Sequence, residues 1–120
     1  MRKVQTDPKR IAKRQELIKK AKEQEPTDEQ VAKLKYISID GHEYSPRNKF
    51  FLALQNVELG RLAGFRQWMK HGCKVKKGER GSDIMIPLIR EDKDKKGKVL
   101  DTETFFKWIV LFHESQTEKI

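Results

Sequence analysis

Apolar residues in the middle of the chain recur at the spacing of a helix that lies on the protein core. Four of them fall on one helical face: Phe50, Phe51, Leu54 and Val57. Ser45 and Pro46 precede this run, and they are residue types that favour the N-cap and the first helical position. The pattern predicts a helix that begins at Ser45-Pro46 and ends at Gly60.

Two further helices are predicted before this one. Residues 8–24 are good helix formers behind a candidate N-cap, Asp7, but their apolar stripe is thin. We therefore expect a basic arm that is either solvated and partly frayed or settles on phosphates when nucleic acid is present. After Glu25-Pro26, Thr27 and Gln30 have the spacing of a capping box and predict a second, short helix.

Alternating and turn-forming residues predict the remaining elements. Residues 36–44 predict a short hairpin that turns at Asp40-Gly41, and Gly72 would end a short helix over residues 64–71. In that helix Phe65, Trp68 and Met69 share one face, which favours a core position for Trp68.

Two strands are predicted next, over residues 73–76 and 83–90, joined by a turn at residues 77–82. Residues 91–101 are strongly charged and predict a loop. Residues 104–113 are apolar on both faces, which is typical of an interior strand and would place Trp108 in the core.

The order of helices and strands predicts an α+β fold. We expect a small antiparallel sheet packed with about three helices and preceded by a basic helical N-terminal arm. Large aliphatic residues are sparse up to Glu25, so the arm would comprise residues 1–26 and the folded domain residues 27–120.

Charge changes this picture by pointing to a polyanionic partner. The chain of 120 residues has a formal net charge of +9. Residues 1–24 contain nine Lys and Arg against three Asp and Glu, and residues 61–80 contain seven against one, so each segment carries +6. The remaining residues therefore carry −3, and a charge distribution of this kind is typical of nucleic-acid-binding proteins.

The second basic segment also contains Phe65 and Trp68, and cations beside aromatic rings suit a single strand with exposed bases. Six candidates would neutralise phosphates: Arg66, Lys70, Lys74, Lys76, Lys77 and Arg80. The alternative is an ordinary solvated turn. Tyr44 and Asn48 are candidates for base contacts, and their alternative role is capping and turn chemistry.

The sequence does not predict an enzyme. A phosphate-binding Gly-x4-Gly-Lys-[Ser/Thr] motif, a Gly-x-Ser-x-Gly motif and matched catalytic carboxylates are all lacking, so we expect no catalytic residues and no cofactor. His42, His71, Cys73 and His113 follow no metal-binding spacing, so no metal is expected. A single cysteine, no apolar run of about 20 residues and no secretory signal lead us to expect a cytoplasmic protein without membrane contact.

A group of motifs resembles a known family. They are Tyr44-Ser45-x-x-Asn48, Gln55, Gly64-Phe65-x-x-Trp68, Gly72, Val75-x-Lys77-Gly78-Glu79-x-Gly81, Ile84, Pro87, Val110-x-Phe112 and Gln116-Thr117. In this order they resemble the N-terminal domain of ArdC-type antirestriction proteins, over residues 44–118. The resemblance implies sequence-independent binding of single-stranded DNA by a plasmid protein; the domain is also found in conjugative primases.

Two departures from that family limit what the resemblance implies. In longer members the domain precedes a zinc-metalloprotease-like domain, but this sequence contains no His-Glu-x-x-His, so no proteolysis is expected. The Pro-Trp pair that often precedes the Tyr-Ser motif is also missing, and the lysine-rich arm stands there instead.

We therefore expect a mobile-element or phage-type protein that binds single-stranded DNA, or RNA, and protects or handles transferred DNA. One alternative is an interaction module whose basic patch binds a restriction enzyme or a replication partner. Another alternative is a protein that binds structured RNA or duplex DNA mainly through the arm. The sequence also leaves open whether a separate catalytic protein is a partner.

Overall fold

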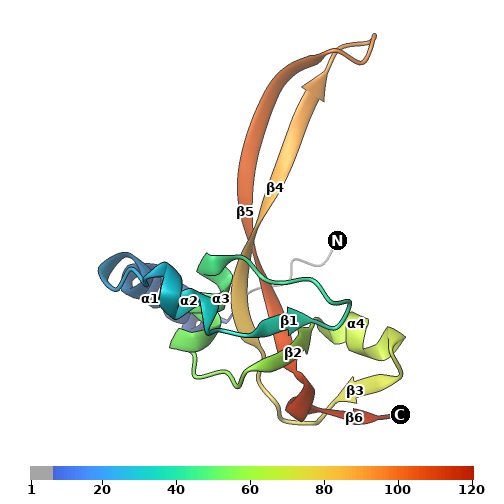
Figure 1. The fold of residues 1–120 in the computed structure, drawn as a ribbon. Helices are drawn as coiled ribbons and strands as arrows, with labels where there is room; N and C mark the ends of the chain where they lie inside the picture. The colour runs from blue at the N-terminus through green and yellow to red at the C-terminus, as the bar shows by residue number, and fades with distance from the viewer. Residues whose placement is uncertain (1–6) are drawn as a thin grey trace.

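The computed structural model describes residues 7–120 as an α+β fold of four α-helices and two sheets (Figure 1). Residues 1–6, which include Arg2 and Lys3 of the N-terminal basic segment, lie outside the described residues. The helices are α1 (Pro8–Glu23), α2 (Asp28–Ala32), α3 (Pro46–Leu54) and α4 (Phe65–Lys70). The strands are β1 (Tyr36–Ser38), β2 (Gly60–Ala63), β3 (Cys73–Val75), β4 (Ser82–Lys93), β5 (Val99–His113) and β6 (Thr117–Lys119), with a 3-10 turn at Glu114–Gln116. The predicted fold class is confirmed.

Local capping signals place the helices where the sequence predicts them. Thr27 and Gln30 form the capping box of α2, and the Ser45 side chain accepts a hydrogen bond from the Asn48 N–H at the start of α3. Helix α3 ends at Leu54 rather than at Gly60. Gly60, with φ of +139°, instead opens β2, a strand that the sequence analysis missed.

The main sheet has the strand order β1-β2-β5-β4. Strands β1 and β2 are parallel, and the other neighbours are antiparallel. Strand β3 pairs with β6 in a separate two-stranded sheet, in which Lys74 stands opposite Glu118. The prediction that a turn joins β3 to β4 as neighbouring strands is therefore wrong, because residues 76–81 connect two different sheets.

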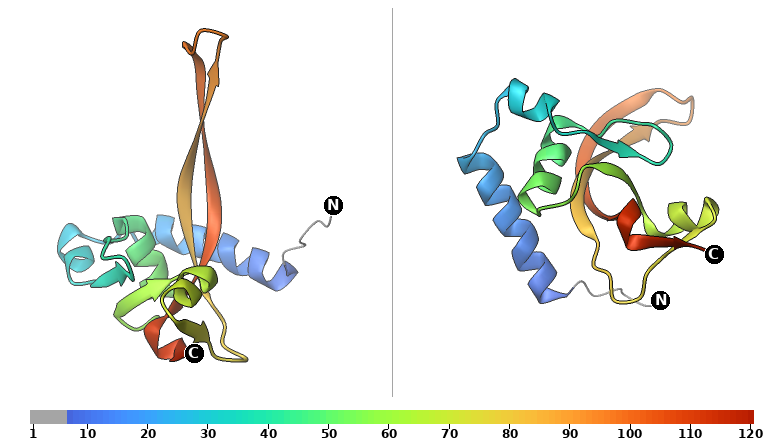
Figure 2. Two further views of the ribbon diagram at one scale, coloured as in Figure 1. Left: turned by 90° about the vertical axis from the view of Figure 1, so that its right-hand side faces the viewer. Right: turned by 60° about the horizontal axis from the view of Figure 1, so that its bottom comes forward.

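Strands β4 and β5 form a long two-stranded ribbon that projects from the body of the protein (Figures 1 and 2). The pairing runs from Ser82 opposite Leu111 to Lys93 opposite Val99. The predicted loop over residues 91–101 is thus mostly strand, and only residues 94–98 turn. Strand β5 is interior near its C-terminal end, where β2 flanks it, while Phe105 and Phe106 on the ribbon are exposed.

The core lies where α3 packs on the base of the ribbon. Its buried cluster consists of Tyr36, Leu52, Leu62, Ile84 and Leu111. The predicted core position of Trp68 is confirmed: its side chain is buried, and its indole N–H donates to the Phe112 carbonyl at 2.9 Å. Trp108 is only half-buried, with its ring 5.6 Å from that of Phe51.

Helix α1 is fixed to β4 by a buried carboxylate. Asp83 is 0% exposed and lies 2.8 Å from Arg10 Nη1, 3.1 Å from Arg14 Nε and 3.6 Å from Lys13 Nζ. Leu17, also on α1, is buried. The expectation of a solvated, frayed arm is therefore wrong for residues 8–23, while the boundary at residue 26 stays a prediction.

Candidate nucleic-acid interface

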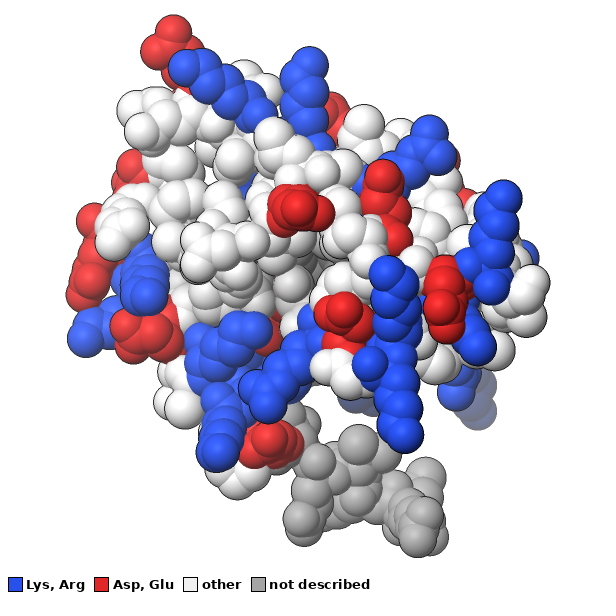
Figure 3. All heavy atoms as spheres, turned by 90° about the horizontal axis from the view of Figure 1, so that it is seen from below, with Lys and Arg blue, Asp and Glu red and all other residues white. Residues whose placement is uncertain are grey.

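The six predicted phosphate-binding cations lie along one continuous stretch of structure. Arg66 and Lys70 belong to α4, Lys74 belongs to β3, and the other three lie in residues 76–81, which we call the basic connection. All six are exposed. Seen from below, Lys and Arg side chains stand around the periphery of the body, most densely at the lower edge of the view, with Asp and Glu side chains between them (Figure 3).

Few of these cations are engaged in contacts within the protein. Lys74 Nζ lies 3.5 Å from Glu118 Oε1, and both side chains are about half exposed. Lys76 Nζ donates to the Ser115 carbonyl at 3.3 Å. Over residues 7–120, the side chains of the other four, Arg66, Lys70, Lys77 and Arg80, form no ion pair or hydrogen bond. Their charges are available to a polyanion.

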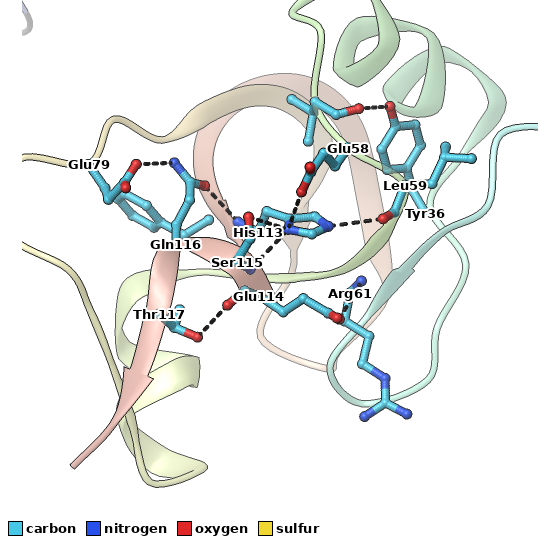
Figure 4. Close-up of polar contacts among 12 residues, drawn as sticks. Tyr36, Glu58, Leu59, Arg61, Glu79, His113, Glu114, Ser115, Gln116 and Thr117 are labelled. Carbon is cyan, nitrogen blue, oxygen red and sulfur yellow. Dashed lines mark hydrogen bonds and ion pairs between the residues drawn. The ribbon is translucent and has the colours of Figure 1, made fainter.

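Gln116 holds the basic connection in one shape (Figure 4). Its Nε2 donates to the Arg80 carbonyl at 2.7 Å and to Glu79 Oε2 at 3.2 Å, and its own carbonyl accepts the Lys76 N–H at 2.8 Å. Gly78 turns the chain with φ of +86°, a conformation that favours glycine. A connection fixed at both ends loses little conformational entropy when it binds a ligand.

His113 anchors the segment that carries Gln116 (Figure 4). Its Nε2 donates to the Leu59 carbonyl at 3.0 Å, and its Nδ1 accepts the Ser115 N–H at 3.0 Å. The Glu58 carboxylate also lies 3.7 Å from Nδ1. His113 is thus a structural residue that ties the end of β5 to the chain before β2.

Tyr44 and Asn48, the predicted base contacts, are committed to interior interactions. The Tyr44 hydroxyl donates to the Leu62 carbonyl at 3.1 Å, and burial together with the Asp40 carboxylate raises the pKa of Tyr44 to about 12. Asn48 is 5% exposed, and its Oδ1 accepts the Met85 N–H at 2.9 Å. Both geometries favour the structural alternative for these two residues.

The tertiary structure brings the two basic segments together, which sequence reasoning missed. Arg10 and Arg14 of α1 reach Asp83, which follows Arg80 by only three residues. The N-terminal half of α1 therefore lies next to the end of the basic connection. The available signal was Asp83 itself, a carboxylate at the start of an apolar strand that needs a partner if it is buried.

Cation–aromatic pairs occur at a different place from the one predicted. The Arg14 guanidinium carbon lies 5.5 Å from the Trp108 ring centre, and that of Arg47 lies 5.9 Å from the Phe106 ring centre. Both distances fall within cation–π range. These pairs stand where α1 and α3 meet the ribbon.

Within residues 7–120, no group of three or more His, Cys, Asp or Glu side chains is arranged to hold a metal ion. No helix in the same part of the chain is long and apolar enough to cross a membrane.

Comparison with solved structures finds the same fold in the antirestriction ArdC protein from plasmid R388. Its metal-free crystal structure aligns with a TM-score of 0.62 and 19% identity, and covers 88% of this chain and 40% of that chain. The Mn(II)-bound structure aligns with a TM-score of 0.52 and 20% identity, and covers 78% and 38%. This chain thus spans less than half the length of those proteins, and at this identity the likeness concerns the fold alone.

Comparison with curated protein sequences gives no match. A family model does: the N-terminal domain of anti-restriction factor ArdC matches residues 8–117. The match begins at α1 and so includes the helix that Asp83 fixes to the body. Because it covers nearly the whole chain, this protein belongs to the family of ArdC N-terminal domains.

Proposed function

We propose that this domain binds single-stranded DNA without reading its sequence, and that it protects or handles transferred DNA as part of an antirestriction system. The observation that carries the proposal is the basic connection, whose exposed Lys77 and Arg80 have no ion-pair partner within residues 7–120 and whose backbone is held by Gln116. Lys and Arg that contact phosphates release counterions, which favours binding of any sequence.

The salt dependence of binding should report how many cations take part. For single strands, log K falls by about 0.7 per decade of salt for each phosphate neutralised, so four to six cations give a slope of roughly −3 to −4. This slope is measured by fluorescence titration of labelled poly-dT, and of a duplex of equal length, at several salt concentrations. A preference for the duplex or a flat salt response would contradict the proposal.

The double variant Lys76→Glu with Lys77→Glu should weaken binding to poly-dT by about tenfold or more, because two attractive charges become repulsive. Its thermal melt should stay nearly unchanged, since both residues are exposed. The chain offers a matched control on the turn of the ribbon, Lys95→Glu with Lys96→Glu, which makes the same change in net charge. If both double variants lose the same affinity, only the net charge of the protein matters and the basic connection is not the site.

A second candidate function, binding of a protein partner, is supported by the ribbon. Leu88 and Phe105 stand opposite each other and share one face of the ribbon, where both are exposed, and Ile89 and Phe106 are exposed on the other face. Exposed apolar side chains favour contact with protein more than with phosphates. In this case a partner such as a restriction enzyme should stay bound after nuclease treatment. Phe105→Ser should release it, whereas the Lys76→Glu, Lys77→Glu variant should not.

A further inference from the structure

A cavity of about 680 Å³ opens between α1, α2, α3 and β4. Figure 1 and the right view of Figure 2 show these helices on one side of the ribbon and the β3–β6 sheet on the other, so the cavity is separate from β3. Its volume lies within the roughly 300–1,000 Å³ of sites that bind small molecules. Nothing in the proposed function so far uses it.

The inner wall of the cavity is apolar and aromatic. Phe50 and Phe51 of α3 and Met85 of β4 line it, together with Ile18 and Val31 of the neighbouring helices. Phe51 is buried, and its ring also contacts Trp108, so this wall is part of the packed body. A wall of this kind accepts a flat ring and takes it out of water.

The rim of the cavity carries charges of both signs. Lys22 of α1 and Arg47 of α3 are exposed cations, and two exposed carboxylates are Glu25, between α1 and α2, and Asp28, the first residue of α2. The guanidinium of Arg47 lies over the Phe106 ring, which limits its freedom. The rim therefore suits a ligand that has both an anionic group and N–H donors.

We propose that this cavity binds a nucleotide whose base carries an exocyclic amino group. The base packs against Phe50 and Met85, the phosphate meets Lys22 or Arg47, and the amino group donates to Glu25 or Asp28. Carboxylates accept hydrogen bonds from such amino groups, which adenine, cytosine and guanine have and thymine lacks. The proposal rests on the proposed function, because the nucleotide is then one unit of the bound strand, and it refines that function: at this one position the strand is read to the extent that thymine is disfavoured. A free nucleotide has the same chemistry.

The methyl group of Met85 provides a direct test, because it lines the cavity, while Leu100 on the ribbon serves as an internal reference. In methyl NMR spectra of the whole chain, dAMP and dCMP should shift the Met85 signal and leave those of Leu100 unchanged. Deoxyribose 5-phosphate, which lacks the base, should not shift it, and dTMP should bind several-fold more weakly than dAMP. Equal shifts from all four probes, or none from dAMP, dCMP or oligo-dC, would overturn the proposal.

Ala21 allows the cavity to be filled without removing a core residue. It lines the cavity on α1, whereas Ala12 lies exposed on the same helix. Ala21→Leu should reduce the affinity for oligo-dC by about tenfold, as expected when stacking of one base is lost. Ala12→Leu, which makes the same change in helix propensity, should have no effect. Equal affinity of the two variants would overturn the proposal.

These experiments distinguish a free nucleotide from a nucleotide of the strand, and they test the cavity proposal independently of the proposed function. A Met85 shift with dAMP or dCMP but not with oligo-dC assigns a free nucleotide, and a shift with oligo-dC assigns a nucleotide of the strand. If the Lys76→Glu, Lys77→Glu variant loses poly-dT affinity but no nucleotide or oligonucleotide moves Met85, the proposed function stands and the cavity proposal fails. If dAMP moves Met85 but poly-dT does not bind, the cavity proposal stands and the proposed function fails.

Discussion

Asp83→Asn should lower the free energy of unfolding by about 3 kcal/mol, because removal of one partner from a buried ion pair costs about 3–5 kcal/mol and these cations are partly exposed. The carboxylate is fully buried, and three cations of α1 depend on it: Arg10, Lys13 and Arg14. With the charge gone, the Arg14 side chain, 14% exposed, has no ion-pair partner within residues 7–120. Helix α1 should then leave the body, and thermal melts should show a Tm lower by more than about 10 °C.

Limited proteolysis adds a structural readout to this prediction. Trypsin should cut α1 of the Asp83→Asn variant much faster than that of the original protein, because the helix holds many Lys and Arg residues and would no longer be docked. Asp92→Asn on the ribbon is the matched control: Asp92 lies 3.9 Å from Arg90, and both are more than half exposed. Such surface pairs contribute about 0–1 kcal/mol. A Tm of Asp83→Asn as high as that of Asp92→Asn would show that the buried pair does not hold α1.

Gly81→Ala should destabilise the protein by at least about 2 kcal/mol, within the range observed when a packed core is overfilled. Gly81 is buried at the start of the ribbon. A Cβ atom there would lie 2.0 Å from Val110 Cγ1, 3.1 Å from the Leu111 carbonyl oxygen and 3.2 Å from Phe112 Cζ. The Val110 side chain would have to move, and the Leu111 oxygen, which belongs to the backbone of β5, would have to shift by a few tenths of an ångström. A urea titration measures the resulting loss of unfolding free energy.

Two further variants test the cause of this loss. Gly64→Ala is the control, because a Cβ there meets its nearest neighbour, Gln67 Oε1, at 3.6 Å, which is ordinary contact. In the double variant Gly81→Ala with Val110→Ala, the atom at 2.0 Å is removed. The double variant should therefore be less destabilised than the sum of the two single variants. Simple additivity would mean that Val110 does not cause the clash.

Several elements could be predicted from the sequence because their signals are local. The capping box of Thr27 and Gln30, the serine cap of α3 and the turn at Asp40-Gly41 each depend on residues within a few positions of one another. The core position of Trp68 was predicted from the helical period, although Phe65 and Met69 on the same predicted face are about half exposed. The exposure of the six candidate cations was also predictable, since lysine and arginine seldom lose their hydration without a partner.

The sheet pairing was not predictable in this way. Strand β3 lies between α4 and β4 in the chain, but it pairs with β6, which begins more than forty residues later. Residues 91–101 look like a loop because their side chains are charged on both faces. In the ribbon both faces are solvated there, so the backbone hydrogen bonds to the opposite strand, not an apolar face, make this segment a strand.

By itself the sequence determined the helices, their caps, the α+β class and the excess of positive charge, since each depends on neighbouring residues or on composition. Only the tertiary structure decided that α1 docks on Asp83, that the two basic segments adjoin, and that Arg14 and Arg47 lie over aromatic rings of the ribbon. The physical reason is that a buried charge and a cation–π pair both need partners from distant parts of the chain. No local pattern in the sequence specifies which distant residues will meet.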